Sequence, residues 1–187
     1  MPAAVESAFD VAFWFADMAL NENEYLQPQK LHRLMFLAQG YYAVAYSGCR
    51  LMPAVFVAEE FGPIEPTIYK AFSKGRPDVD VDLIVPEDVD SFLRSIWHRF
   101  GHHSTERLTR ITNETAAYGQ ALRRGLRAEI GHDSMRRSFA GAQDAPALDQ
   151  RQGARGARFV RVERAAARID RPQVALAEED ASDHLPR

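Results

Sequence analysis

The strongest hydrophobic pattern of helical period lies in residues 28–46. Its apolar residues recur at steps of three and four over four turns, at Leu31, Leu34, Met35, Ala38, Tyr41, Tyr42 and Ala45. Phe36 and Leu37 widen this stripe until most sides of the helix are apolar, which predicts a buried central helix. Pro28 is typical of a first helical turn, and Gly48 is typical of a helix end.

Similar patterns, together with capping residues, predict further helices at residues 5–20, 66–72 and 86–100, a short one capped by Ser104, and a last one at 133–139 capped by Asp133. Residues 51–58 and 78–85 have strand-like composition and are predicted to pair as a ribbon. Gly62-Pro63 predicts a tight turn between them. The expected fold class is mainly α, a compact helical domain with a small two-stranded β-ribbon.

Composition divides the chain into two parts. The 187 residues are 46% hydrophobic, enough for one well-buried domain, which we place at residues 1–140. From residue 141 to 187 the chain is rich first in Arg and then in acidic residues, and we expect a weakly ordered tail, or one ordered on a partner. The N-terminus lacks basic residues, no apolar run reaches bilayer length, and the single Cys49 excludes an internal disulfide. These features predict a cytoplasmic protein that is not bound to a membrane.

Four short motifs occur in order along the first half of the domain. They are PQKL at residues 28–31, LMFLAQGYY at 34–42, FGPI at 61–64 and IY at 68–69. Together they resemble the Panacea domain family, whose pattern is a helix of the type KLQKLLYFAQGWYLA, a strand ending in A-x-x-x-GPV-x-P, and a following VY-x-x-F. The resemblance covers about residues 8–140. It is imperfect downstream, because Asn113 and Tyr118 stand where the family has a His and a Trp.

The resemblance implies protein binding without enzymatic activity or cofactor. Panacea proteins include antitoxins of two-gene toxin–antitoxin systems, and the SocA type is a proteolytic adaptor that hands its toxin to the ClpXP protease. We therefore expect an antitoxin that binds and neutralises its cognate toxin, either by masking it or by delivering it to ClpX. A role that depends on the family's His could not operate at Asn113.

The toxin-binding surface is predicted around residues 60–69, where the turn is expected to be exposed and rigid. Its candidate residues are Glu60, Phe61, Gly62, Pro63, Ile64 and Tyr69. Three polar residues on the polar arc of the central helix are expected to border it, namely Lys30, His32 and Arg33. The alternative is purely structural: Gly62-Pro63 shapes the turn and Tyr69 packs.

Two other classes of function are left open. His98, His102 and His103 would serve a metal-dependent hydrolase, and the step from His98 to His102 suits two ligands on one helix face. However, Gly101 interrupts that helix, and no acid or Cys nearby in the sequence completes a zinc set, so histidines at a helix end are the simpler interpretation.

The second alternative is a nucleic-acid-binding regulator. Arginines recur every three or four residues in the tail, at Arg151, Arg155, Arg158, Arg161, Arg164, Arg168 and Arg171. A solvated surface is the simpler interpretation of these arginines, and the net charge of −3 provides no general attraction for nucleic acid. The sequence leaves the oligomeric state open.

Overall fold

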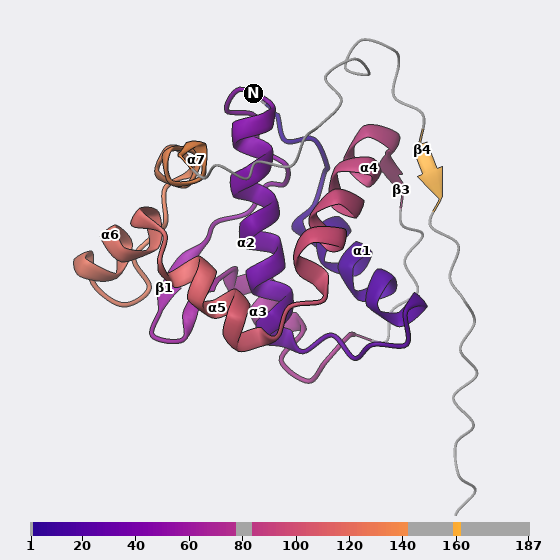
Figure 1. Ribbon diagram of the computed structural model, residues 1–187, viewed down its shortest axis with the longest axis horizontal. Helices are drawn as coiled ribbons and strands as arrows, with labels where there is room; N and C mark the ends of the chain where they lie inside the picture. The colour runs from indigo at the N-terminus through magenta and orange to yellow at the C-terminus, as the bar shows by residue number, and fades with distance from the viewer. Residues whose placement is uncertain (1, 78–83, 142–158, 162–187) are drawn as a thin grey trace, which may run out of the picture.

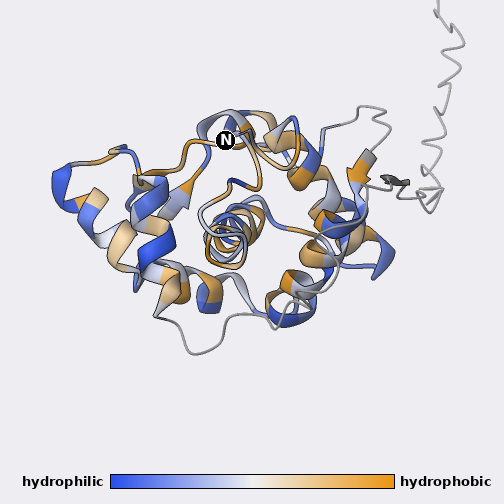
Figure 2. Ribbon diagram, turned by 90° about the horizontal axis from the view of Figure 1, so that it is seen from above, coloured by the Kyte–Doolittle hydropathy of each residue, from blue (hydrophilic) through white to orange (hydrophobic). Residues whose placement is uncertain are grey.

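Helix α2 (Pro28–Ala45) runs through the middle of the molecule, and the other helices surround it (Figure 1). Seen from above, α2 is nearly end-on at the centre of the remaining elements (Figure 2). Every residue from 30 to 43 is buried. The prediction of a buried central helix is therefore confirmed. This computed structural model describes residues 2–77, 84–141 and 159–161.

The described residues are mainly helical, as predicted, with one small sheet in the first half of the chain. The other helices are α1 (Ala8–Asn21), α3 (Pro66–Ala71), α4 (Glu87–Ile96), the π-helical turn η1 (Trp97–Gly101), α5 (Thr105–Asn113), α6 (Ala116–Arg124) and α7 (His132–Ala140). The strands are β1 (Val57–Glu59), β2 (Gly62–Ile64), β3 (Ile84–Pro86) and β4 (Phe159–Arg161). None of these helices is both long enough and apolar enough to cross a lipid bilayer.

Local capping explains where several helices begin. Ser7 caps α1 through its hydroxyl, which accepts from the backbone N–H of Phe9, while the Asp10 carboxylate accepts from the Ser7 N–H. Ser104 caps α5 as predicted. The predicted cap of the last helix is wrong, because Gly131 is the N-cap residue of α7 and Asp133 lies in its first turn.

The predicted ribbon exists, but its strands are not the ones predicted. Strand β1 pairs antiparallel with β2, so the turn is formed by Glu60 and Phe61 and the Gly62-Pro63 pair belongs to a strand. Ala58, which lies opposite Pro63, bonds to the segment on the other side of β1: its N–H donates to the carbonyl of Ala128 at 3.0 Å, and its carbonyl accepts from the Arg127 N–H at 2.8 Å. Most of the predicted partner, residues 78–83, lies outside the described residues.

The end of the predicted segment forms a different strand. Residues 84–86 are β3, which pairs antiparallel with β4. The other tail residues, 142–158 and 162–187, lie outside the described part of the chain. The division into a domain and a tail stays a prediction.

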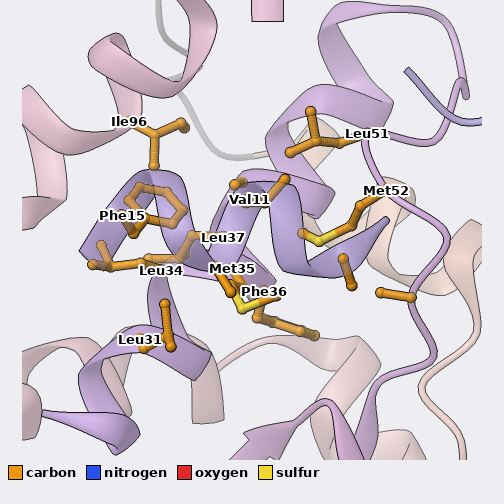
Figure 3. Packing of buried hydrophobic residues seen from close by; sticks show 14 of the residues in the cluster. Val11, Phe15, Leu31, Leu34, Met35, Phe36, Leu37, Leu51, Met52 and Ile96 are labelled. Carbon is orange, nitrogen blue, oxygen red and sulfur yellow. The ribbon is translucent and has the colours of Figure 1, made fainter. Parts of the chain in front are cut away.

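One hydrophobic cluster extends from Val5 to Phe139 and joins α1, α2, α4 and the segment before β1. Figure 3 shows part of it, with residues of α1, α2 and α4 beside Leu51 and Met52. One buried hydrogen bond crosses this core: the Trp14 indole Nε1 donates to Asp90 Oδ1 at 2.8 Å, which ties α1 to α4. This cluster packs around α2 and fixes the helix in place, and with it the polar side chains that α2 carries.

Gly40 lets α7 pack directly on α2, and this contact generates a prediction for stability. A Cβ at Gly40 would lie 2.2 Å from the Phe139 ring, and the ring is itself buried. We expect Gly40→Ala to lower the free energy of unfolding by about 1–3 kcal/mol through overpacking. Urea denaturation followed by circular dichroism measures the change.

Gly119→Ala is the matched control. It also lies in a helix, but its Cβ would have as nearest neighbour the end of the Arg123 side chain at 3.7 Å. Alanine favours the helix over glycine, so this variant should be as stable as the parent or up to about 1 kcal/mol more stable. Equal effects of both substitutions would contradict the packing explanation.

Candidate protein-binding site

The turn between β1 and β2 rests on a buried arginine of the central helix. Arg33 is fully buried, and its Nη1 donates to the carbonyl oxygen of Pro63 at 2.7 Å. Its Nη2 donates to the carbonyl of Phe61, and its Nε donates to the Thr109 hydroxyl of α5 at 3.2 Å. One guanidinium group thus binds the turn and a second helix at the same time.

Arg33 makes these bonds without a carboxylate partner, since none of the ion pairs among the described residues includes it. Burial lowers the pKa of its guanidinium to about 10. Two backbone carbonyls and a hydroxyl therefore solvate the Arg33 guanidinium in place of water. Removing any of these partners would leave a buried donor unsatisfied.

Gly62 is required twice at this contact. Its φ of +121° lies in the region that side chains disfavour, and it begins the returning strand. In addition, a Cβ at this position would lie 2.6 Å from Cζ of Arg33. The glycine of the FGPI motif thus makes room for the arginine as well as reversing the chain.

His32 lies next to Arg33 and supports the other end of the hairpin. The backbone N–H of Glu65 donates to its Nδ1 at 3.4 Å, and the Glu65 carboxylate caps α3 by accepting from the Ile68 N–H at 2.6 Å. Burial, and next the charge of Arg33, lower the pKa of His32 to about 4. The imidazole is therefore neutral at physiological pH.

Tyr118 of α6 is a further support that sequence reasoning missed. Its hydroxyl donates to the carbonyl oxygen of Glu59 at 2.6 Å, at the end of β1. Arg127 also pairs with the Glu59 carboxylate at 2.9 Å. In the sequence, Tyr118 stands out only as a departure from the family pattern. The signal that could have placed it on a helix is Thr115, which caps α6 just before this tyrosine.

Above this support, the turn exposes two aromatic side chains. Phe61 is 38% exposed and Tyr69 of α3 is 45% exposed, and their rings stack with centroids 6.2 Å apart. Tyr69 in turn contacts the buried ring of His32, with centroids 5.8 Å apart. Glu60 is also exposed, whereas the predicted surface residues Gly62, Pro63 and Ile64 are buried.

A groove of about 410 Å³ adjoins the aromatic pair. It is lined by residues of the turn, of the first turn of α2 and of α5, namely Gln29, Phe61, Thr105, Glu106, Thr109 and Arg110. Thr109 is the residue whose hydroxyl accepts from Arg33. The arginine therefore holds both the turn and one wall of the groove.

The expectation that Lys30, His32 and Arg33 form an exposed polar arc is wrong. All three are buried, with exposed fractions of 6%, 1% and 0%. His32 and Arg33 lie beneath the turn and cannot contact a partner directly. Lys30 instead pairs with Glu24 in the loop before α2. A polar face of a helix usually predicts exposure to solvent. Here the segments that cover α2 instead provide buried partners for its polar side chains.

The three histidines proposed for a hydrolase do not gather into one site among the described residues. His98 is exposed, His103 contacts Phe100, and His102 lies 6.2 Å from Trp97, ring to ring. Cys49, the single cysteine, is half-buried. Among the described residues, the three-histidine cluster expected for a hydrolase is therefore not formed.

Comparison with known proteins finds no match: no family model, no curated protein and no solved structure is significantly similar to this chain. The resemblance to the Panacea domain thus stays a prediction based on its motifs.

The double role of Gly62 can be tested by substitution. We expect Gly62→Ala to lower the free energy of unfolding by about 1–3 kcal/mol for the backbone alone, with a further loss from displacing Arg33. Gly125→Ala is the matched control, because Gly125 has a similar φ of +132° and an open environment. Urea denaturation of both variants separates backbone strain from the clash. Equal losses would contradict the requirement for space.

The burial of His32 predicts a pH dependence. The folded state protonates His32 near pH 4 and the unfolded chain near 6.5, so the unfolded state binds more protons between these values. The contribution of His32 to the free energy of unfolding is therefore fully present above pH 6.5. It falls by about 3 kcal/mol as the pH is lowered to 4.

His32→Gln should remove this part of the pH dependence, whereas His98→Gln, which replaces an exposed histidine, should retain it. Urea denaturation at several pH values between 7 and 4 measures both curves. The same slope in the His32→Gln variant and in the parent protein would show that another group is responsible.

Proposed function

We propose that this protein is an antitoxin that binds its cognate toxin through the face formed by Phe61, Tyr69 and the adjoining groove. The observation that carries the proposal is the exposed, stacked aromatic pair on a turn that is held from below by a buried arginine. Exposed aromatic residues in a fixed position are typical anchors of protein interfaces. The resemblance of the motifs to the Panacea family implies that the partner is a toxin.

The rigidity of the turn favours binding over a purely structural role. Phe61 offers its ring to solvent while its backbone carbonyl accepts from Arg33. The preceding strand ends at Glu59, whose carbonyl accepts from Tyr118. Because the backbone is already ordered on both sides, little conformational entropy would be lost when a partner covers the aromatic pair.

The groove beside Phe61 suits one inserted side chain of the toxin. Its volume of about 410 Å³ leaves room for a large side chain, and Glu106 and Arg110 among its lining residues can pair with charges around an apolar anchor. An apolar centre with a polar rim is the usual arrangement of an interface whose partners also exist separately.

Neutralisation can proceed by masking or by delivery to ClpXP, the activity of SocA-type adaptors. Delivery requires a second surface for the protease, and we assign it to residues 142–187. A chain truncated after Ala140 distinguishes the two modes. Masking predicts that the truncated protein still protects cells, and delivery predicts that it still binds the toxin but no longer causes its degradation.

The binding face is tested with the product of the neighbouring toxin gene. We expect Phe61→Ala with Tyr69→Ala to weaken binding by at least about 100-fold and to abolish growth protection, because each anchor contributes about 2 kcal/mol or more. Calorimetric titration measures the affinity, and co-expression with the toxin measures protection.

The control carries Val55→Ala and Leu126→Ala, two side chains of comparable exposure, 49% and 56%, outside the proposed face. It should bind as the parent protein does, and both double variants should retain helical circular dichroism. Normal binding by the aromatic variant together with lost binding by the control would place the interface elsewhere.

A further inference from the structure

Two glutamates and a histidine that are far apart in sequence meet at one end of the helical bundle. Glu22 follows the last turn of α1, Glu24 lies in the next loop, and His102 follows η1. One ligand atom from each side chain lies within 4.8 Å of the other two. Sequence reasoning found no acid near His102, because the two glutamates come from a segment about 80 residues earlier.

We propose that Glu22, Glu24 and His102 bind a divalent cation of the zinc class, which joins the end of α1 to the end of η1. Zinc binds imidazole nitrogens and carboxylate oxygens with bonds of about 2.0–2.2 Å, and these three side chains supply one nitrogen and two carboxylates. None of these three residues lines the proposed toxin-binding face, and neither proposal depends on the other.

Each carboxylate is oriented by a donor outside the site. The Trp97 indole Nε1 donates to Glu22 Oε1 at 2.9 Å, and the buried ammonium of Lys30 donates to Glu24 Oε1. In both glutamates the hydrogen bonds among the described residues leave Oε2 for a further partner. This is the arrangement of metal sites, in which outer hydrogen bonds fix the carboxylates that hold the ion.

The histidine faces the second oxygen of Glu22 without a hydrogen bond. His102 Nδ1 lies 3.9 Å from Glu22 Oε2, beyond hydrogen-bonding distance. Two ligands at tetrahedral angles on one zinc ion are about 3.3 Å apart, given bonds of about 2.0 Å. This pair would therefore have to approach by about 0.6 Å to bind one ion, and the Glu24 carboxylate, which lies within 4.8 Å of the other two ligand atoms, by at most about 1.5 Å.

The π-helical turn accounts for the position of His102. Such turns are rare and are frequent at functional sites. A Cβ at Gly101 would lie 2.6 Å from the Trp97 ring, so the glycine lets this indole lie against the turn. Trp97 is thereby placed to orient Glu22, and the residue after Gly101 is the histidine. The same turn thus supplies one ligand and orients another.

The ligand atoms and the local charge indicate which ion the site would prefer. The charge of Lys30 offsets one of the two carboxylates, so the three ligands and Lys30 carry a net charge near −1. Ca²⁺ and Mg²⁺ prefer sites made only of oxygen ligands, and Ca²⁺ takes six or more. A nitrogen ligand and few oxygens favour Zn²⁺, and we expect neither Ca²⁺ nor Mg²⁺ to replace it.

The test is a calorimetric titration of untagged, chelator-treated protein with ZnCl₂. We expect one Zn²⁺ per chain, and at least a 10-fold weaker affinity for Glu22→Gln and for His102→Ala. Glu22→Gln keeps an oxygen that can accept from Trp97, so it removes the charge with little change in the structure. His98→Ala and His103→Ala are the controls and should bind within about twofold of the parent protein.

A second readout does not depend on affinity alone. Co²⁺ bound to the parent protein should give the visible absorption of a low-coordinate site, and His102→Ala should lose it while keeping its helical circular dichroism. The proposal is overturned if the parent protein binds no zinc, or if Glu22→Gln and His102→Ala bind zinc as tightly as the parent protein. It is also overturned if His98→Ala loses as much zinc affinity as these two variants, or if equimolar Mg²⁺ or Ca²⁺ displaces the zinc.

Discussion

The burial of polar side chains along α2 is the constraint on which the rest of the structure depends. A helix that is covered on every side must satisfy its polar groups from the segments that cover it, because an unpaired group in the interior is costly. Lys30 pairs with the loop after α1, and His32 binds the start of α3. Arg33 binds the β1–β2 turn, and Gln39 accepts from the backbone before β1. Each polar residue thus positions a different segment.

Arg33 shows how such a pairing serves a surface. Its guanidinium is hidden, but the carbonyls that it binds belong to the residues that present the aromatic face. The turn is consequently ordered before any partner arrives, and Gly62 provides the space that this requires. A buried cation held by carbonyl groups rather than a carboxylate also leaves no second charge that would need its own partner.

Local patterns carry much of this fold. The period of apolar residues predicts α1, α2 and α4, because amphipathic helices depend on neighbours three and four positions away, and Pro66 predicts where α3 begins. The surface residues are harder: Phe61 and Tyr69 are exposed as predicted, but Arg33 is not. The polarity of an arginine predicts that it lies at the surface. Arg33 can be buried because Gly62, 29 positions later, has no Cβ to collide with its guanidinium group.

The sequence by itself determined that the chain is mainly helical, that residues 28–45 form its centre, and that a turn lies near Gly62. These features follow from short-range periodicity and backbone preferences. Tertiary structure alone decided that β1 pairs with β2, that Tyr118 supports Glu59, and that His102 meets Glu22. Contacts of this kind join segments separated by as many as 80 positions, and they depend on how the helices pack around α2 rather than on any local pattern.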